Sequence, residues 1–342
     1  MVATMSDQTP EIYCLGRAGM DLYALEDGAD FHAVSGFEKQ VGGSPANIAI
    51  GLARLGVKAG IITRVSDDLV GHYVAAELER NGVDIGALSF DASGTRTSLA
   101  VTEVKDEECG VVIYRHRAAD LALSPGDVDT ADIAGAKLLL ITGTALSAEP
   151  SRSAARHALD TAIATGTRCV LDLDYRACAW ASRNEAEEVC REFALTCHVV
   201  VGNDEELALI AEDTATAVEL LFDAGVDIVV AKQGREGSAI YQRHGATLRR
   251  SAKLVREKKP FGAGDAFAAR LCAGWLKDEP LERVLEEAAA AAAWVVGSRR
   301  CGIDTPTRDE IARLIAESES SGTDGTGVDI DELRRTNGEN RT

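Results

Sequence analysis

Short apolar runs that alternate with helical patterns constrain the fold of this 342-residue chain more than any other feature. We expect strands at residues 12–16, 60–65, 138–142, 169–173, 198–201 and 227–232. We expect helices at residues 45–55, 70–81, 151–165, 184–194, 204–211 and 216–224. This alternation favours a three-layer α/β/α sandwich, in which helices cover both faces of a mostly parallel sheet and ligands bind at the carboxyl ends of the strands.

One β-rich region interrupts the alternation. Residues 95–102 and 110–115 flank the charged turn 105–108, which predicts a hairpin. With residues 22–40, the segment 95–120 could form a small β lid over a ligand site, or the hairpin could be an ordinary sheet edge. A lid would exclude water from the site beneath it.

Composition predicts one domain at residues 11–317, between a flexible N-terminus (1–10) and a disordered acidic tail (318–342). The net charge of −19 argues against nucleic acid or an anionic membrane as a partner. The longest apolar run, residues 288–296, is too short to span a membrane. The eight cysteines form no C-x-x-C pair and no secretory leader is visible, so we expect a cytoplasmic protein with reduced thiols. The scattered histidines argue against a protein-bound zinc site.

The segment Phe261-Gly262-Ala263-Gly264-Asp265 combines an anion-binding turn with an acidic side chain. The glycines allow a tight turn that exposes backbone N–H groups, and residues 265–276 then have the pattern of a helix. The start of that helix would attract a phosphate or a developing negative charge. Asp265 could act beside this anion as a general base, or it could simply cap the helix.

A second glycine-rich turn, at Gly42 and Gly43, precedes the helix expected at residues 45–55. Pro45 lies near the start of this helix and Gly56 follows its last apolar residue, which are typical start and stop signals. The amide of Asn47 faces the opening of the helix, where it could hold a sugar hydroxyl or satisfy a backbone N–H group.

Taken together, the two segments resemble the two signatures of the ribokinase-like, or PfkB, family of carbohydrate kinases. The resemblance covers nearly all of residues 11–316 and includes three further motifs in the family's order, at residues 16–21, 201–206 and 231–237. It implies a ribokinase-like fold and transfer of a phosphoryl group from ATP to a sugar hydroxyl, with Mg²⁺ carried by the nucleotide phosphates.

The resemblance also implies a role for each motif. Asp265 would accept the proton of the attacking primary hydroxyl, and the backbone N–H groups of the turn would stabilise the transferring phosphoryl group; the turn residues are Gly262, Ala263 and Gly264. The sugar hydroxyls would be bound by Asp21, Gly42, Gly43 and Asn47. The nucleotide would be bordered by Asn203, Lys232, Gly234 and Gly237. Glu206 would hold Mg²⁺ through water, although from sequence alone it could lie on an exposed acidic helix face, and Lys232 could be a solvated strand end.

Three arginines indicate the class of substrate. Within the family the likeness is greatest to kinases of keto-deoxy sugar acids, and it is carried by residues 42–55, 114–121 and 172–176. Arg115, Arg117 and Arg176 follow predicted strands, and with Tyr114 they would bind the substrate at one mouth. A guanidinium suits a carboxylate, which a neutral sugar lacks, but these arginines could instead pair with the protein's own carboxylates.

The implied reaction is phosphorylation of 5-dehydro-2-deoxy-D-gluconate to its 6-phosphate, a step of myo-inositol catabolism. Alternative substrates are 2-keto-3-deoxygluconate and fructose, and a sugar-sensing protein on the same fold remains open. The chain lacks the Gly-Lys pair of a P-loop kinase, and residues 16–19 lack the dinucleotide-binding pattern of a dehydrogenase. Lids of relatives also mediate dimerisation, so a homodimer through the lid is an option.

Two positions depart from the family pattern. Lys259-Pro260-Phe261 stands where many relatives carry an Asp-Thr-Thr that helps to bind a monovalent cation, so dependence on such a cation is doubtful. The ammonium of Lys259 could replace the cation. Arg270 stands where the family signature has a small residue.

Overall fold

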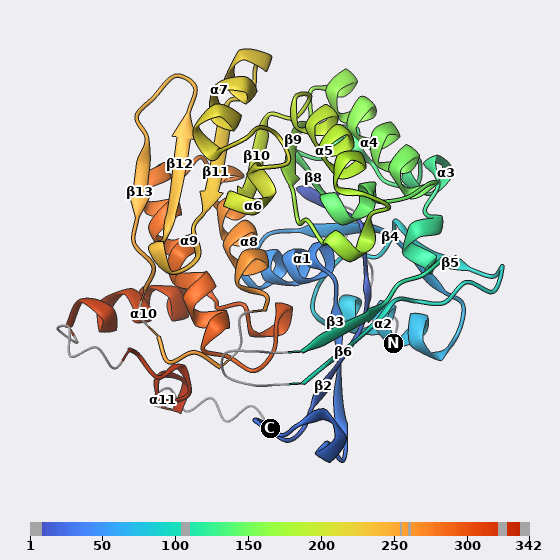
Figure 1. The fold of residues 1–342 in the computed structure, drawn as a ribbon, viewed down its shortest axis with the longest axis horizontal. Coiled ribbons are helices and arrows are strands. Elements are labelled where there is room, and N and C mark those ends of the chain that lie inside the picture. Colours follow the sequence, from blue (N-terminus) through green and yellow to red (C-terminus); the bar gives the residue numbers. More distant parts are fainter. Residues whose placement is uncertain (1–8, 104–109, 254, 259–260, 321–326, 336–342) are drawn as a thin grey trace.

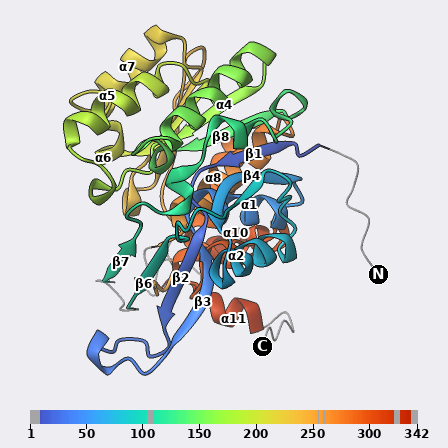
Figure 2. The same cartoon turned by 90° about the vertical axis from the view of Figure 1, so that its right-hand side faces the viewer.

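A nine-stranded sheet lies between two layers of helices, and a separate four-stranded sheet extends away from it (Figures 1 and 2). The structure is a computed structural model that describes residues 9–103, 110–253, 255–258, 261–320 and 327–335. This arrangement is the expected three-layer sandwich with a mostly parallel sheet.

The strands of the large sheet follow the order β13-β12-β11-β10-β9-β8-β1-β4-β5. Their bounds are β1 Ile12–Leu15, β4 Ala59–Ser66, β5 Leu88–Asp91, β8 Leu138–Thr142, β9 Arg168–Asp172, β10 Val199–Asn203, β11 Ile228–Lys232, β12 Ser238–Gln242 and β13 Leu248–Arg250. All pairs from β11 to β5 are parallel, whereas β12 and β13 are antiparallel additions at one edge. The six predicted strands are confirmed within two residues, and β5, β12 and β13 are additional because their sequences lack a continuous apolar run.

Successive residues of the buried strands face two different hydrophobic cores. In β8, Leu138 and Leu140 pack on one side, whereas Leu139 and Ile141 pack on the other. Helices of the first core are α1 Ser44–Arg54, α2 Leu69–Arg80, α8 Ala263–Trp275, α9 Leu281–Val296 and α10 Arg308–Ser320. Helices of the second core are α3 Pro125–Val128, α4 Ser151–Thr165, α5 Arg183–Ala194, α6 Asp204–Leu207 and α7 Thr214–Ala224. Burial on both faces explains why these strands are continuously apolar.

The predicted helices are confirmed, with one difference in length. Helix α4 has the predicted bounds, and the others begin or end within two residues of the prediction. Helix α6 ends at Leu207, four residues earlier than expected, and residues 208–211 form a turn and a bend instead of continuing the helix. None of the helices within the described ranges is long and apolar enough to cross a membrane.

The smaller sheet contains both segments that the sequence assigns to a lid. Its order is β3-β2-β6-β7, with bounds β2 Gly19–Ala24, β3 Phe37–Gly42, β6 Leu99–Thr102 and β7 Val111–Tyr114. Strands β6 and β7 pair antiparallel, and β6 joins β2 rather than the large sheet. The hairpin is therefore part of a separate four-stranded unit and is not an edge of the main sheet, although its predicted turn 105–108 lies outside the described residues.

Part of the C-terminal segment contradicts the expectation of disorder. Val328 pairs with Val255 in a β-bridge, and helix α11 (Ile330–Arg335) follows it. The side chain of Ile330 is 1% exposed and packs over Gly297, at the end of α9. The guanidinium of Arg334 lies 5.3 Å from the centre of the Trp294 ring. Residues 327–335 are thus docked on the molecule, because Ile330 and Arg334 contact the end of α9. The acidic composition of the segment did not indicate these contacts.

Candidate active site

Asp265 lies in the first turn of α8 and is held by two side chains from the start of α1. The hydroxyl of Ser44 donates to one carboxylate oxygen at 2.7 Å, and the amide nitrogen of Asn47 donates to the other at 2.8 Å. Burial raises the pKa of Asp265, and these two hydrogen bonds oppose that rise. The carboxylate therefore has a fixed orientation at a helix N-terminus, where the first N–H groups lack carbonyl partners within the helix.

The turn before Asp265 requires glycine. Gly262 has φ +83°, and a Cβ there would lie 2.9 Å from the sulfur of Cys301. Any larger residue would therefore combine a left-handed backbone with a steric clash. The sulfur of Cys301 also lies 3.1 Å from the hydroxyl of Tyr23, and Phe261 packs against both side chains. Lys259 and Pro260, which precede Phe261, lie outside the described residues.

The predicted sugar-binding residues come together at the junction of the two sheets. A Cβ on Gly42 would lie 2.0 Å from the carboxylate of Asp21, and a Cβ on Gly43 would lie 2.2 Å from the carbonyl oxygen of Arg17. The Arg17 guanidinium donates to Asp21 at 3.2 Å and to Ser98 at 2.8 Å. The two glycines thus allow the side chain of Asp21 in β2 and the backbone of Arg17, just before β2, to approach the start of α1 closely.

Asn47 is buried, and its amide bonds at both ends within the protein. Besides its bond to Asp265, its oxygen accepts the backbone N–H of Gly302 at 3.2 Å. The backbone hydrogen bond is one of the two options that the sequence left open. The structure adds that this amide joins α1 to α8, since Asp265 is 218 residues further along the chain.

Two carboxylates and a lysine meet beyond the ends of β9, β10 and β11. The ammonium of Lys232 lies 3.1 Å from Asp172 and 3.7 Å from Glu206. Burial is the main cause that raises the pKa of Asp172 to about 6, and the neighbouring ammonium opposes that rise. A Cβ placed on Gly264 would lie 3.5 Å from the Lys232 nitrogen, so this cluster adjoins the turn of α8.

Glu206 is buried at the start of α6 rather than exposed on a helix face. Its carboxylate accepts the backbone N–H of Asn203 at 2.8 Å and that of Tyr175 at 3.2 Å. The side chain of Asn203 accepts the N–H of Glu206 in return, which completes a capping box. Glu206 and Asp172 offer carboxylate oxygens, the hard donors that Mg²⁺ prefers, but within the described residues no group of three or more potential metal ligands forms, so such an ion would be held largely through water.

Asp174 belongs to the same site, although sequence reasoning did not select it. It has φ +30°, an uncommon conformation for a residue other than glycine, and is buried. Its carboxylate accepts a hydrogen bond from Thr144 at 3.2 Å and lies 3.1 Å from the guanidinium of Arg176. Burial raises the pKa of Asp174 to about 6, with a further increase from Asp265. Its position two residues beyond the end of β9 was the available signal, since ligands bind at that edge.

The predicted arginines have different environments. Arg115 is mostly buried: its guanidinium donates to Asp120 at 2.8 Å and to the Thr144 carbonyl at 2.8 Å. Arg176 is about half exposed and pairs with Asp174. Arg115 donates to Thr144, and Arg176 is linked to the same residue through Asp174, so each arginine already contacts a protein carboxylate. Arg117 and Tyr114 are exposed, and Tyr114 is the last residue of β7 on the lid.

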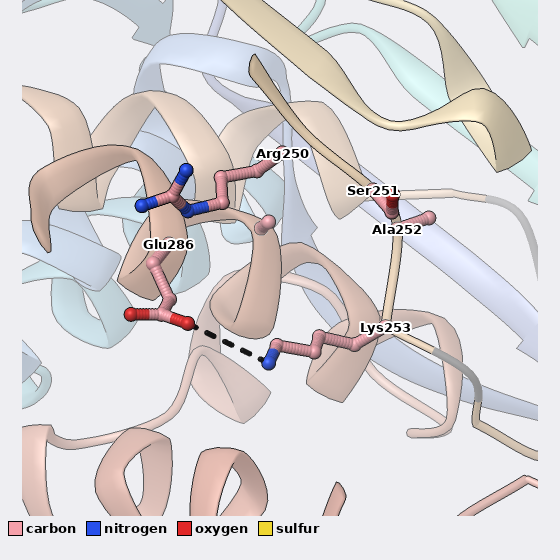
Figure 3. A pocket seen from close by; sticks show the side chains of 6 residues that line it. Arg250, Ser251, Ala252, Lys253 and Glu286 are labelled. Carbon is pink, nitrogen blue, oxygen red and sulfur yellow. Dashed lines mark ion pairs between the residues drawn. The ribbon is translucent and has the colours of Figure 1, made fainter. Parts of the chain in front are cut away.

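The glycine loop after β11 adjoins a pocket. Gly234 has φ +56° and Gly237 has φ +110°, and a Cβ on Gly237 would lie 2.0 Å from the carbonyl oxygen of Arg250. The next residues line a cavity of about 300 Å³ against α9 (Figure 3). Its lining residues are Arg250, Ser251, Ala252, Lys253, Glu286 and Ala289. Lys253 and Glu286 face each other across it at 3.8 Å.

Arg270, the arginine that departs from the family signature, forms a buried ion-pair cluster. Arg270 is completely buried in α8 and pairs with Glu279 and Glu287. These glutamates also bind the more exposed Arg308 and Arg283. The buried charge of Arg270 on α8 is therefore compensated by two carboxylates.

Comparisons with known proteins agree with this architecture. Residues 9–308 match the pfkB family of carbohydrate kinases. The chain is 39% identical to a 5-dehydro-2-deoxygluconokinase from Photobacterium profundum, over 93% of this chain and 98% of that protein. It is 40% identical to the protein of the same name from Geobacillus kaustophilus, over 90% and 94%. An uncharacterized sugar kinase from Pyrococcus horikoshii, solved in complex with ATP, is 25% identical with a TM-score of 0.75, over 89% and 99%. The chain belongs to the pfkB family of carbohydrate kinases.

Proposed function

We propose that this protein transfers the γ-phosphoryl group of ATP to the primary hydroxyl of 5-dehydro-2-deoxy-D-gluconate. The observation that carries the proposal is the carboxylate of Asp265, which Ser44 and Asn47 hold at the N-terminus of α8. An oriented base beside free backbone N–H groups suits phosphoryl transfer to an alcohol. Relatives named 5-dehydro-2-deoxygluconokinase at about 40% identity over nearly the full length support this substrate.

The hydroxyl oxygen forms a bond to the γ-phosphorus while the bond from that phosphorus to the oxygen of the leaving ADP breaks. The hydroxyl proton moves to a carboxylate oxygen of Asp265 and later to solvent. The N–H groups of Gly262, Ala263 and Gly264 stabilise charge on the transferring oxygens, and general-base catalysis typically contributes about 10²–10⁴-fold.

In the proposed complex, the nucleotide binds along the loop after β11. Gly234 and Gly237 let the backbone turn close to the ligand, and Lys232 and Asn203 border the phosphates. The cavity between Arg250 and Glu286 is a candidate for the adenine, because Arg250, which lines it at the end of β13, lies against Gly237 of this loop. The ATP complex of the Pyrococcus horikoshii sugar kinase supports ATP as the phosphoryl donor.

Mg²⁺ would be held through water by Glu206, with Asp172 beside it. When bound, the ion neutralises phosphate charge. The protein's own contribution is the capping box at Asn203, which fixes the Glu206 carboxylate before any ligand arrives. No monovalent cation is part of the proposal, because Lys259 occupies the position of the usual aspartate.

In the proposed complex, the sugar binds between the start of α1 and the arginines Arg115 and Arg176. Asp21, Gly42, Gly43 and Asn47 contact its hydroxyls, the last in addition to holding Asp265. Arg176 binds the substrate carboxylate, since its guanidinium is about half exposed and accessible to a ligand. Arg115 is mostly buried and contributes indirectly, through its hydrogen bond to the Thr144 carbonyl. Tyr114 and Arg117 close over the sugar from the lid.

A second copy of the chain is proposed to cover the lid. Several large apolar side chains are exposed on it, namely Leu25, Phe31, Phe37, Val111, Val112 and Tyr114. Exposed apolar side chains gathered on one small sheet are typical of an interface. Within the described ranges the seven cysteines form no disulfide with one another, which supports the cytoplasm as the compartment.

The test is a coupled assay of ADP release across sugar acids and neutral hexoses. We expect the highest kcat/KM with 5-dehydro-2-deoxy-D-gluconate, and lower values with 2-keto-3-deoxygluconate and fructose. A preference for fructose would show that the carboxylate plays no part in recognition. Saturable sugar binding without ADP release would instead indicate a sensor.

A further inference from the structure

Two carboxylates hold the ammonium of Lys232, one from the end of β9 and one from the start of α6. Lys232 ends β11, and its nitrogen lies 3.1 and 3.4 Å from the two oxygens of Asp172, which ends β9. Glu206 lies 3.7 Å from the same nitrogen, and the lysine side chain is only 18% exposed. The ammonium is therefore held in one place rather than moving through solvent.

The fixed ammonium adjoins the turn of α8. A Cβ on Gly264 would lie 3.5 Å from the Lys232 nitrogen, and Gly264 is the second residue of the helix. An ammonium has three N–H donors. Within the described part of the chain, its hydrogen bonds go to Asp172 alone, so at least one donor is available to a ligand at the turn.

The charges around the turn explain why a cation is needed there. Asp172, Asp174, Glu206 and Asp265 gather in the same site, and all four would repel the phosphates of a nucleotide. Phosphoryl transfer also spreads negative charge over the oxygens of the moving group. A lysine that is already fixed by the protein can compensate this charge without reorganisation.

Building on the proposed function, we propose that Lys232 is a catalytic residue whose ammonium donates a hydrogen bond to the γ-phosphoryl oxygens during transfer. Asp172 and Glu206 act as positioning residues that aim the ammonium. Lys232 keeps its proton throughout, so the bonds made and broken are those already given for the transfer.

The test measures nucleotide binding without any sugar. Calorimetry with a non-hydrolysable ATP analogue and with ADP, both with Mg²⁺, compares the wild type with Lys232→Met. We expect the variant to lose at least about tenfold in affinity for the analogue and less than about threefold for ADP, because only the analogue carries a γ-phosphoryl group. Lys137→Met, which removes an exposed lysine paired with Glu11, should change neither affinity.

A second variant guards against misfolding. Lys232→Met leaves Asp172 buried without its partner, so Lys232→Met combined with Asp172→Asn removes the pair together. If both the single and the double variant lost affinity equally for the ATP analogue and for ADP, the proposal would be overturned. Lys232 would then have only a structural role. Because no sugar is present, this result is independent of the substrate: a wild type that releases no ADP with sugar acids would contradict only the proposed function.

Discussion

The amide nitrogen of Asn47 lies 2.8 Å from a carboxylate oxygen of Asp265, and this contact links the first turns of α1 and α8. Each glycine-rich segment therefore supplies one half of the same site. The bond orients the carboxylate for which a base role is proposed, and it lowers a pKa that burial raises.

Asp265→Asn should abolish most of the turnover. The amide keeps the size of the side chain but cannot accept a proton, so we expect kcat to fall at least about 100-fold. Nucleotide affinity, measured by calorimetry, should change little because the backbone turn remains. Near-normal turnover in this variant would remove Asp265 from its proposed role.

Asn47→Ala should move the pH profile of the reaction. Loss of the donor raises the pKa of Asp265 further, and the base works only when ionised. The acidic limb of kcat against pH should therefore shift to higher pH, so that the variant loses more activity at low pH than at high pH. Asn81→Ala, which removes an amide at the end of α2, serves as the control. A uniform loss at every pH would argue against this coupling.

Arg176→Ala should discriminate acidic from neutral sugars. If its guanidinium binds the substrate carboxylate, KM for the sugar acid should rise at least about tenfold, and KM for a neutral hexose should rise far less. Arg183→Ala, an exposed arginine of α5 that pairs with Glu187, provides a matched control. Equal increases for both substrates would exclude Arg176 from carboxylate recognition.

Asp174→Asn should stabilise the fold in a pH-dependent way. The pKa of Asp174 is raised from 3.8 to about 6, so its stabilising contribution is present below the lower value and is lost as pH rises through the higher one. An asparagine does not ionise, so its advantage should grow between pH 4 and pH 8, to at most about 3 kcal/mol. Urea unfolding at both pH values measures this, with the exposed Asp160→Asn as control. A constant difference would show that ionisation is not the cause.

Arg270→Ala should destabilise the protein by about 3–5 kcal/mol, because it leaves Glu279 and Glu287 without their buried partner. Arg283→Ala removes an exposed partner of the same Glu287 and should cost less than about 1 kcal/mol. Chemical unfolding of the two variants gives the comparison. Similar losses from both would mean that burial of Arg270 adds nothing.

Local patterns determined much of the fold. The buried strands β8 and β9 were predictable because both of their faces are covered, which requires continuous apolar residues. The turns at Gly43 and Gly262 were also predictable. Both residues have a positive φ angle, which glycine adopts readily, so a glycine pair in the sequence already indicates such a turn. The order of these motifs along the chain was sufficient to indicate the family.

Long-range pairing could not be deduced from the same patterns. The docking of Ile330 on Gly297 depends on a few side chains within an acidic, glycine-containing segment. The bond from Arg115 to the Thr144 carbonyl depends on how the smaller sheet meets the main sheet.

The layers, the glycine turns and the acidic residue at the start of α8 were readable from the amino-acid sequence, because these depend on periodicity and on local backbone conformation. The bonds from Asn47 to Asp265 and from Lys232 to Asp172 became visible only in the folded chain. The partners are 218 and 60 residues apart, and a side chain's charge and hydrogen bonds depend on neighbours that the packed elements bring within about 3 Å.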